Sequence, residues 1–228
     1  MGTDLGDNAL DASACDQYFT ALFEGQVVMA ILRGMDPAMT VALCERAWQA
    51  GISTAEVTIE SEAALPSLRA AVERGSQLGR TVGAGTVTTC ARVTAALRAG
   101  AGFTVAPGFD ERVASASLAV GLPHLPGIAT PTEIQHAVRL GFRWLKVFPA
   151  RELGPGWISA ISGPFPDVHI VATGGIGPDN APDFLAAGSR VVAVGGNLSQ
   201  SGAIESLARL RALRETTTDG SKSMRTRS

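Results

Sequence analysis

The chain has 228 residues, of which 46% are hydrophobic, and its formal net charge is −2. A chain of this length favours one large core, as in a single α/β barrel or a doubly wound domain, over two small domains. The weak charge, without any basic run, argues against nucleic-acid or anionic-membrane partners. No apolar stretch reaches the roughly 20 residues that a membrane-spanning helix needs.

The N-terminal residues 1–13 are acidic and polar, so we expect a flexible N-terminus rather than a signal or transit peptide. The three cysteines are widely spaced and form no CxxC pair, which indicates free thiols in a reducing cytoplasm. The three histidines are also scattered, so the sequence predicts neither a metal site nor a cofactor.

Apolar, β-rich runs alternate with helix-like segments along the rest of the chain. The first element is a short helix at Ala14–Phe23, placed to plug the floor of a barrel. Eight predicted strands follow, at Val27–Leu32, Ser53–Thr58, Thr81–Ala84, Phe103–Ala106, Pro123–Pro126, Arg143–Phe148, Val168–Ala172 and Val191–Val194.

The segments between these strands carry helix signals. The first of them begins with Asp36 and Pro37, an N-cap and a first-turn proline. The last helix is predicted at Ser201–Thr216, and the polar tail 217–228 is predicted to be disordered. Eight β-α repeats within residues 14–216 predict a single-domain (β/α)8 TIM barrel. A doubly wound sheet is the alternative, because a strand count does not prove closure.

Strand parity predicts which side chains enter the barrel. Thr54–Ile59 alternates polar and apolar residues, and the apolar face must meet the helices, so Glu56 points inward. The same parity on the sixth strand places Lys146 inward, with Trp144 and Phe148 on its face. An acid and an amine are therefore expected in one cavity.

Lysine is rare in this sequence. Of its 19 lysines and arginines only two are lysines: Lys222, in the polar tail, and Lys146, in an apolar run. A buried amine needs a partner or a chemical role, and guanidinium cannot perform amine chemistry because it stays protonated. The other interpretations are a lysine that snorkels to solvent and a purely structural ion pair with Glu56.

The predicted strand exits are rich in glycine, and barrel enzymes react at this end of their strands. Glycine lets the backbone approach a ligand closely. Thr173-Gly174-Gly175 and Gly195-Gly196-Asn197 each lead into a predicted helix, an arrangement that binds phosphate through backbone N–H groups. The alternative is two tight turns without a ligand.

Eight short segments occur in a characteristic order: AILRG, AEVTIES, VGAGTV, TVAPGF, LPGIATPTE, LKVFPA, VATGGIGPDN and VGGN. From about Val27 to Leu198 the chain thus resembles the 2-keto-3-deoxy-6-phosphogluconate aldolase family, class I aldolases of the Entner–Doudoroff type. That family includes 2-keto-3-deoxy-6-phosphogalactonate and 4-hydroxy-2-oxoglutarate aldolase activities. The resemblance implies a cytoplasmic homotrimer that needs no metal.

The resemblance also implies site residues. Lys146 is the Schiff-base lysine, and Glu56 is the general acid/base. The substrate-binding set comprises an anion-binding arginine, the lining of the pyruvyl pocket, an aromatic ring beside the imine and the phosphate-binding exits. In chain order these are Arg33, Thr86, Pro107, Phe148, Thr173, Gly174, Gly175, Gly195, Gly196 and Asn197.

The implied reaction cleaves a 2-keto-3-deoxy-6-phospho sugar acid to pyruvate and glyceraldehyde 3-phosphate through an imine on Lys146. One position departs from the family pattern, because gluconate-type enzymes often carry an arginine where this chain has Glu60. A carboxylate cannot bind a carboxylate, so Arg33 is expected to take over this task. Galactonate-type members also lack that arginine and carry ILRG, which favours the galactonate type, while Glu60 leaves the substrate assignment open. The alternatives are an unphosphorylated 4-hydroxy-2-oxoglutarate-type substrate, an epimerase or isomerase, and a sugar-phosphate sensor.

Overall fold

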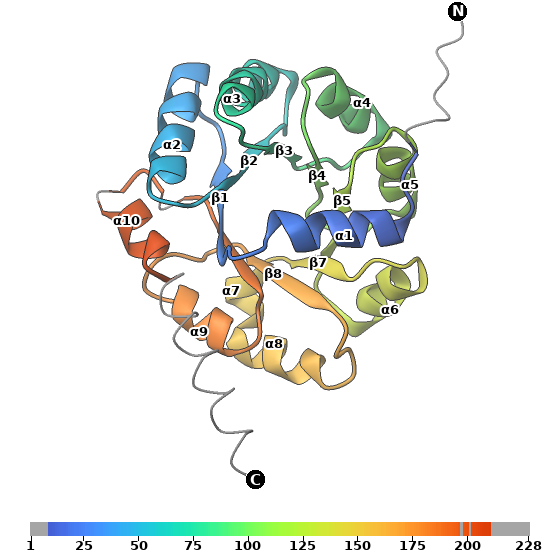
Figure 1. Cartoon of the computed structure of the whole chain (residues 1–228). Coiled ribbons are helices and arrows are strands. Elements are labelled where there is room, and N and C mark those ends of the chain that lie inside the picture. Colours follow the sequence, from blue (N-terminus) through green and yellow to red (C-terminus); the bar gives the residue numbers. More distant parts are fainter. Residues whose placement is uncertain (1–8, 197, 201, 211–228) are drawn as a thin grey trace, which may run out of the picture.

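In the computed structural model, which describes residues 9–196, 198–200 and 202–210, parallel strands form a ring covered by helices (Figure 1). Neighbouring strands follow the order β5-β4-β3-β2-β1-β9-β8-β7-β6. The strands are β1 (Val28–Leu32), β2 (Thr54–Thr58), β3 (Val82–Gly85), β4 (Thr104–Val105), β5 (His124–Leu125), β6 (Gly127–Ile128), β7 (Trp144–Val147), β8 (His169–Thr173) and β9 (Val191–Val194).

The ring closes through the segment 124–128. Its first half, β5, pairs with β4, and its second half, β6, pairs with β7. Between them the carbonyl of Pro126 accepts a hydrogen bond from the Lys146 amide at 2.8 Å. The predicted (β/α)8 barrel is confirmed, and the doubly wound alternative is wrong. The predicted fifth strand, Pro123–Pro126, corresponds to β5 alone, and a further short strand, β6, follows Pro126, which has no N–H to donate to a ladder.

The helices follow the strands on the outside of the ring. They are α2 (Pro37–Gln49), η1 (Glu62–Ala64), α3 (Leu65–Gln77), α4 (Cys90–Arg98), α5 (Glu111–Ala119), α6 (Pro131–Arg139), α7 (Ala150–Leu153), α8 (Pro155–Ser162), α9 (Ala181–Ala186) and α10 (Ala203–Ala208).

Local sequence explains several helix starts. The Asp36 side chain accepts from the Met39 amide and Pro37 opens α2, as predicted. Thr130 and Glu133 form a capping box at α6. The predicted last helix, Ser201–Thr216, is represented by α10, while residues 211–228, with the predicted tail, lie outside the described part.

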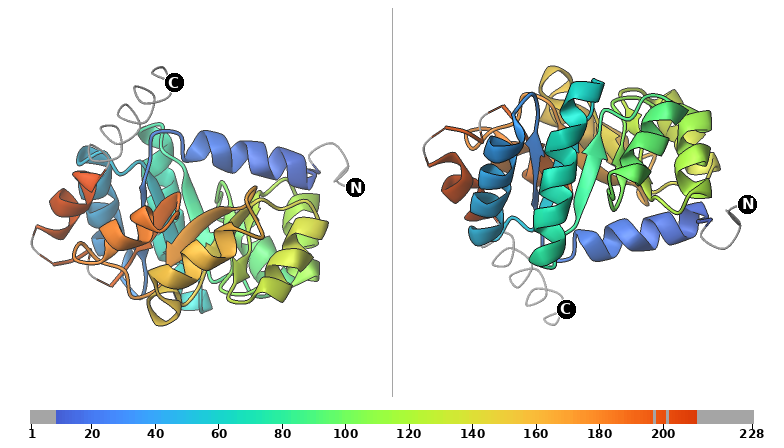
Figure 2. Two further views of the ribbon diagram at one scale, coloured as in Figure 1. Left: turned by 90° about the horizontal axis from the view of Figure 1, so that it is seen from below. Right: turned by 90° about the horizontal axis from the view of Figure 1, so that it is seen from above.

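An additional helix, α1 (Ala12–Leu22), lies across one end of the barrel, as the two views of Figure 2 show. It begins two residues before the predicted start, because the Asp11 side chain caps it by accepting from the Ala14 amide. Phe19 packs on Phe103 with ring centroids 5.7 Å apart, and Phe23 packs on Trp144 at 5.0 Å. Because Trp144 opens β7, α1 covers the N-terminal ends of the strands, the floor of the barrel.

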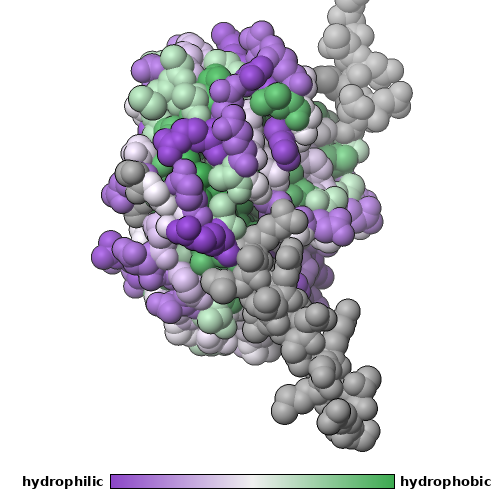
Figure 3. Space-filling view, turned by 60° about the vertical axis from the view of Figure 1, so that its left-hand side comes forward, coloured by the Kyte–Doolittle hydropathy of each residue, from purple (hydrophilic) through white to green (hydrophobic). Residues whose placement is uncertain are grey.

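On the face drawn in Figure 3, hydrophilic residues lie over much of the surface, with hydrophobic residues scattered among them. Among the described residues, the large hydrophobic side chains that are well exposed are Met39, Leu78, Leu97 and Phe148. No helix in the described part has the length and hydrophobicity to cross a membrane. Phe148 follows β7 directly, so this exposed ring marks the end of the barrel opposite α1.

Candidate active site

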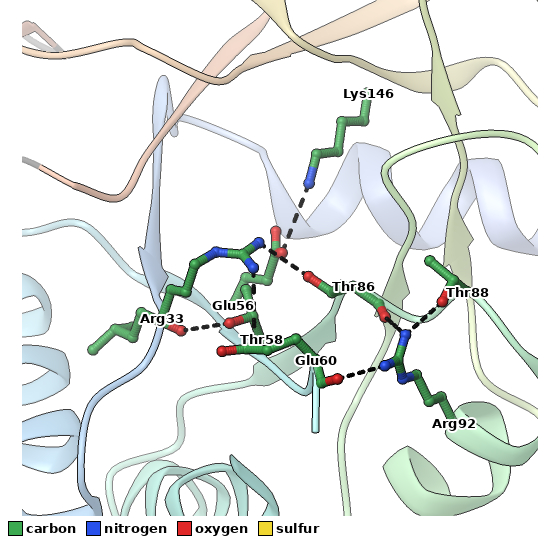
Figure 4. Close-up of polar contacts among 9 residues, drawn as sticks. Arg33, Glu56, Thr58, Glu60, Thr86, Thr88, Arg92 and Lys146 are labelled. Carbon is green, nitrogen blue, oxygen red and sulfur yellow. Dashed lines mark hydrogen bonds and ion pairs between the residues drawn. The ribbon is translucent and has the colours of Figure 1, made fainter. Parts of the chain in front are cut away.

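Lys146 and Glu56 face each other inside the barrel. Lys146 lies on β7 and Glu56 on β2, and their side chains point toward one another in Figure 4. The Lys146 Nζ is 3.8 Å from the Glu56 Oε1, and the two side chains are 5% and 0% exposed. Strand parity therefore predicted the meeting of this acid and this amine correctly. Snorkelling to solvent is excluded for Lys146.

Glu56 is buried without conventional hydrogen-bond donors. Among the described residues neither of its carboxylate oxygens accepts a hydrogen bond. A buried carboxylate without donors is costly, so Glu56 depends on the Lys146 charge and on whatever enters the cavity. The neighbouring strand makes room for it, because a Cβ at Gly85 would overlap the Glu56 carboxylate. Two free acceptor atoms beside an amine are what a proton-transferring carboxylate requires.

Phe148 lies at the rim next to this pair, and Pro107 follows β4 at the same end of the barrel. The Lys146 Nζ is 5.6 Å from the centroid of the Phe148 ring. The exit of β4 carries Pro107, whose carbonyl lies so near Gly127 that a Cβ there would overlap it. Trp144, in contrast, lies at the floor against α1, so of the two aromatic residues predicted on this face only Phe148 is beside the amine.

Arg33 and Thr86 meet at the rim above the lysine and the acid. The Arg33 Nη2 donates to the Thr86 Oγ1 at 3.0 Å, and its Nη1 lies 3.8 Å from the Glu60 Oε2 (Figure 4). Thr86 has a φ of 60°, a left-handed conformation that β-branched residues rarely adopt. The departure from the family pattern at Glu60 thus places a carboxylate beside the predicted anion-binding arginine.

The charge of Glu60 is stabilised by its surroundings. Burial raises the pKa of its carboxyl group, but hydrogen bonds from Thr58 and from its own backbone, together with the charges of Arg33 and Arg92, outweigh burial. The pKa of Glu60 is therefore lower than that of an ordinary glutamate. The rim consequently carries a stable negative charge between two arginines.

Arg92, on α4, is a site residue that sequence reasoning missed. Its Nη1 donates to the Thr86 carbonyl at 3.3 Å and to the Thr88 Oγ1 at 2.5 Å, while its Nη2 donates to the Glu60 carbonyl. An arginine in the first turn of a helix opposes the helix dipole. That unfavourable placement, three residues after the N-cap Thr89, is the signal in the sequence that indicates a local partner.

The two predicted phosphate-binding exits lie side by side, because β8 pairs with β9. Thr173 is buried at the end of β8, and Gly174 and Gly175 follow with φ values of 100° and 69°, which favour glycine. The stem of Arg151, a second residue that the sequence did not indicate, lies against Gly175.

At the β9 exit, Gly195 packs near Ile31, and a Cβ at Gly196 would meet nothing within 4 Å. The remaining predicted member of this exit, Asn197, lies outside the described residues. The structure thus brings Lys146 and Glu56 together in the barrel and places the other predicted, described residues at the strand exits.

A family model described as KDPG and KHG aldolase matches residues 20–213. The chain belongs to this family. It is an aldolase, as the sequence predicted. The match covers most of the barrel and includes every predicted site residue.

Among its relatives is the 2-dehydro-3-deoxy-phosphogluconate aldolase of Pseudomonas aeruginosa, 39% identical over 147 residues, which are 64% of this chain and 66% of the relative. The probable 2-dehydro-3-deoxy-6-phosphogalactonate aldolase of Rhizobium meliloti is 33% identical over 82% of this chain and 88% of its own length.

The aldolase is also similar to a solved structure of KDPG aldolase from Legionella pneumophila, in which pyruvate is captured as a covalent carbinolamine intermediate. The two share 27% sequence identity and a TM-score of 0.73, over 84% of this chain and 95% of the other.

Proposed function

We propose that this aldolase cleaves a 2-keto-3-deoxy-6-phospho sugar acid to pyruvate and glyceraldehyde 3-phosphate through a Schiff base on Lys146. The observation that carries the proposal is the Lys146 Nζ, enclosed in the barrel 3.8 Å from a carboxylate without other partners. Two relatives named for the gluconate and the galactonate substrates support this substrate class.

The first half of the reaction forms the imine. Lys146 passes a proton to Glu56 and, now uncharged, attacks the C2 ketone of the substrate to give a carbinolamine. Glu56 supplies the proton with which the hydroxyl group leaves as water, and the iminium ion remains. The Phe148 ring lies over the amine and keeps one side of it apolar.

The second half breaks the carbon–carbon bond. Glu56 accepts the proton of the C4 hydroxyl, the C3–C4 bond breaks, and its electron pair moves into the iminium to form an enamine. The C4 fragment leaves as the aldehyde. Glu56 then returns a proton to C3, and water hydrolyses the iminium to release pyruvate and restore Lys146.

The rim binds the two ends of the substrate in this proposal. Arg33 and Thr86 receive the carboxylate next to C2, with Pro107 beside them. The backbone N–H groups after β8 and β9, including Gly174, Gly175, Gly195, Gly196 and Asn197 with Thr173, hold the distal phosphate. Arg151 supports the phosphate assignment, because its stem lies against Gly175 and adds a positive charge to this exit. Binding energy from the phosphate then orients the reacting bond.

A substrate panel tests the proposal. Pyruvate release is measured with the gluconate and galactonate forms of the 2-keto-3-deoxy-6-phospho acid, with their unphosphorylated forms and with 4-hydroxy-2-oxoglutarate. We expect kcat/KM for a phosphorylated acid to exceed that for its plain counterpart by about a hundredfold or more, and the galactonate form to be preferred. Turnover without carbon–carbon cleavage, as for an epimerase, or binding without turnover, as for a sensor, would contradict it.

We also propose that the enzyme is a cytoplasmic homotrimer. Membership of the family supports this assignment. Light scattering coupled to size-exclusion chromatography tests the oligomeric state, and a monomer at micromolar concentration would contradict it.

A further inference from the structure

Arg92 joins two strand exits that lie next to each other. The exits of β2 and β3 are neighbours, because Thr58 pairs with Gly85 in the sheet. The guanidinium of Arg92 bonds to backbone carbonyls on both sides, at Glu60 after β2 and at Thr86 after β3. No step of the proposed reaction uses Arg92, so its three contacts at the rim need a separate explanation.

The contacts of Arg92 fall on a strained residue. A left-handed φ is strained for a β-branched residue and persists only where the surroundings fix it. Thr86 is held at its carbonyl by Arg92 and at its hydroxyl by Arg33. The direction of the Thr86 hydroxyl, and with it the direction of the Arg33 guanidinium, therefore depends on Arg92.

We propose that Arg92 is a positioning residue that fixes Glu60 and Thr86 so that both hold the Arg33 guanidinium ready for the substrate carboxylate. This inference rests on the proposed function and assigns a role to Glu60, the position that departs from the family pattern. Glu60 orients the arginine and does not contact the substrate.

The geometry explains why Arg33 needs such support. Its side chain is 56% exposed, so a free Arg33 would sample many rotamers and lose entropy on binding. Thr86 and Glu60 take up one nitrogen each. A guanidinium has five N–H donors, so enough remain for a bidentate contact with a carboxylate.

A mutant cycle tests the inference. Arg92→Ala, Arg33→Ala and the double variant are compared with the wild type in steady-state cleavage of the best acid of the panel. We expect Arg92→Ala to raise KM about tenfold with kcat changed less than about threefold, since the lost interaction is with the carboxylate. In the Arg33→Ala background the same change should raise KM by less than about twofold.

Two further variants sharpen the cycle. Arg92→Lys keeps the positive charge, but its ammonium group lacks the planar set of N–H donors with which the guanidinium contacts three acceptors. We therefore expect its KM to lie closer to that of Arg92→Ala than to that of the wild type, on a logarithmic scale. The matched control is Arg98→Ala, an exposed arginine on the same helix, which should behave as the wild type. If Arg92→Ala does not fold, Arg92→Gln replaces it in the same cycle.

The inference fails if KM for Arg92→Ala stays within about twofold of the wild type, if only kcat falls, or if the losses in the double variant are additive. Failure of the proposed function looks different. In that case the wild-type protein itself neither cleaves the phosphorylated acids nor forms a borohydride-trapped adduct with pyruvate.

Discussion

At the scale of single residues, the barrel fixes the place of Glu56 but supplies its carboxylate with few hydrogen-bond donors. Its two oxygens accept no hydrogen bond in the described part of the chain, and Lys146 is its only ion-pair partner there. A structural ion pair would gain from further hydrogen bonds to the carboxylate. The free acceptors instead leave room for a water molecule or a substrate hydroxyl, as proton transfer requires.

Glu56→Gln tests this role. The amide keeps the shape of the side chain but cannot accept a proton, so we expect kcat to fall about a hundredfold or more while pyruvate is still trapped on Lys146. Steady-state kinetics measure the fall. Glu45→Gln, which removes the surface partner of Arg74, is the matched control and should leave kcat unchanged. Unchanged turnover in Glu56→Gln would make Glu56 structural.

The residues that sequence reasoning found and missed differ in what determines their position. Period-two alternation fixes the face of a strand residue, so Glu56 and Lys146 were predictable. Arg92 acts on the carbonyls of Thr86 and Glu60, and the sequence does not encode where a loop carbonyl points. The sequence showed the charge reversal at Glu60, but its pairing with Arg33 depends on the fold of two exits.

At the scale of elements, β2 and β3 are fitted to each other at the active site. Glu56 pairs in register with Gly83, and its side chain lies over Gly85 two residues further along β3. Gly83 is itself covered by the Phe103 ring, and a Cβ there would overlap it. Gly83 thus makes room for Phe103, and Gly85 makes room for Glu56. This packing explains both glycines of the VGAGTV segment, and the sequence alone did not reveal it.

We expect Gly85→Ala to displace the Glu56 carboxylate, because the added methyl group occupies its place. Overpacking of this kind costs about 1–3 kcal/mol of unfolding free energy, and kcat should fall at least tenfold. Urea unfolding and steady-state kinetics measure the two effects.

The control is Gly156→Ala on α8, where a Cβ would meet nothing within 4 Å. It should be neutral or slightly stabilising, because alanine favours a helix. Wild-type kcat in Gly85→Ala would contradict the tight fit between β2 and β3.

At the scale of the whole molecule, period and composition did not predict the additional strand β6 that follows β5 after Pro126. The alternation of strands and helices and the glycines between them were enough to predict the barrel. The segment 124–128, however, pairs first with β4 and then with β7, and this change of pairing depends on closure of the ring. Next to this seam lies His124, fully buried, with its Nδ1 2.8 Å from the Thr104 Oγ1.

Burial lowers the pKa of His124 to about 4. In the unfolded chain the pKa of this histidine is about 6.5, so above this pH His124 is neutral in both states and its contribution to the unfolding free energy is fully present. As the pH falls toward 4 only the unfolded state takes up the proton, and about 3 kcal/mol of unfolding free energy is lost.

We therefore expect His124→Asn to lose less stability than the wild type between pH 7 and pH 4, as measured by urea unfolding. His136→Asn, at an exposed histidine, should keep the wild-type dependence. Equal pH dependence in the wild type and His124→Asn would contradict the assignment of the proton uptake to His124.

In the proposed mechanism Lys146 forms the imine, and the sharpest test of this role is borohydride reduction in the presence of pyruvate. We expect one covalently attached pyruvate unit per chain, located by peptide mass spectrometry on Lys146, and no adduct in Lys146→Ala, which should still fold. An adduct on another residue, or none on the folded wild-type enzyme, would contradict it.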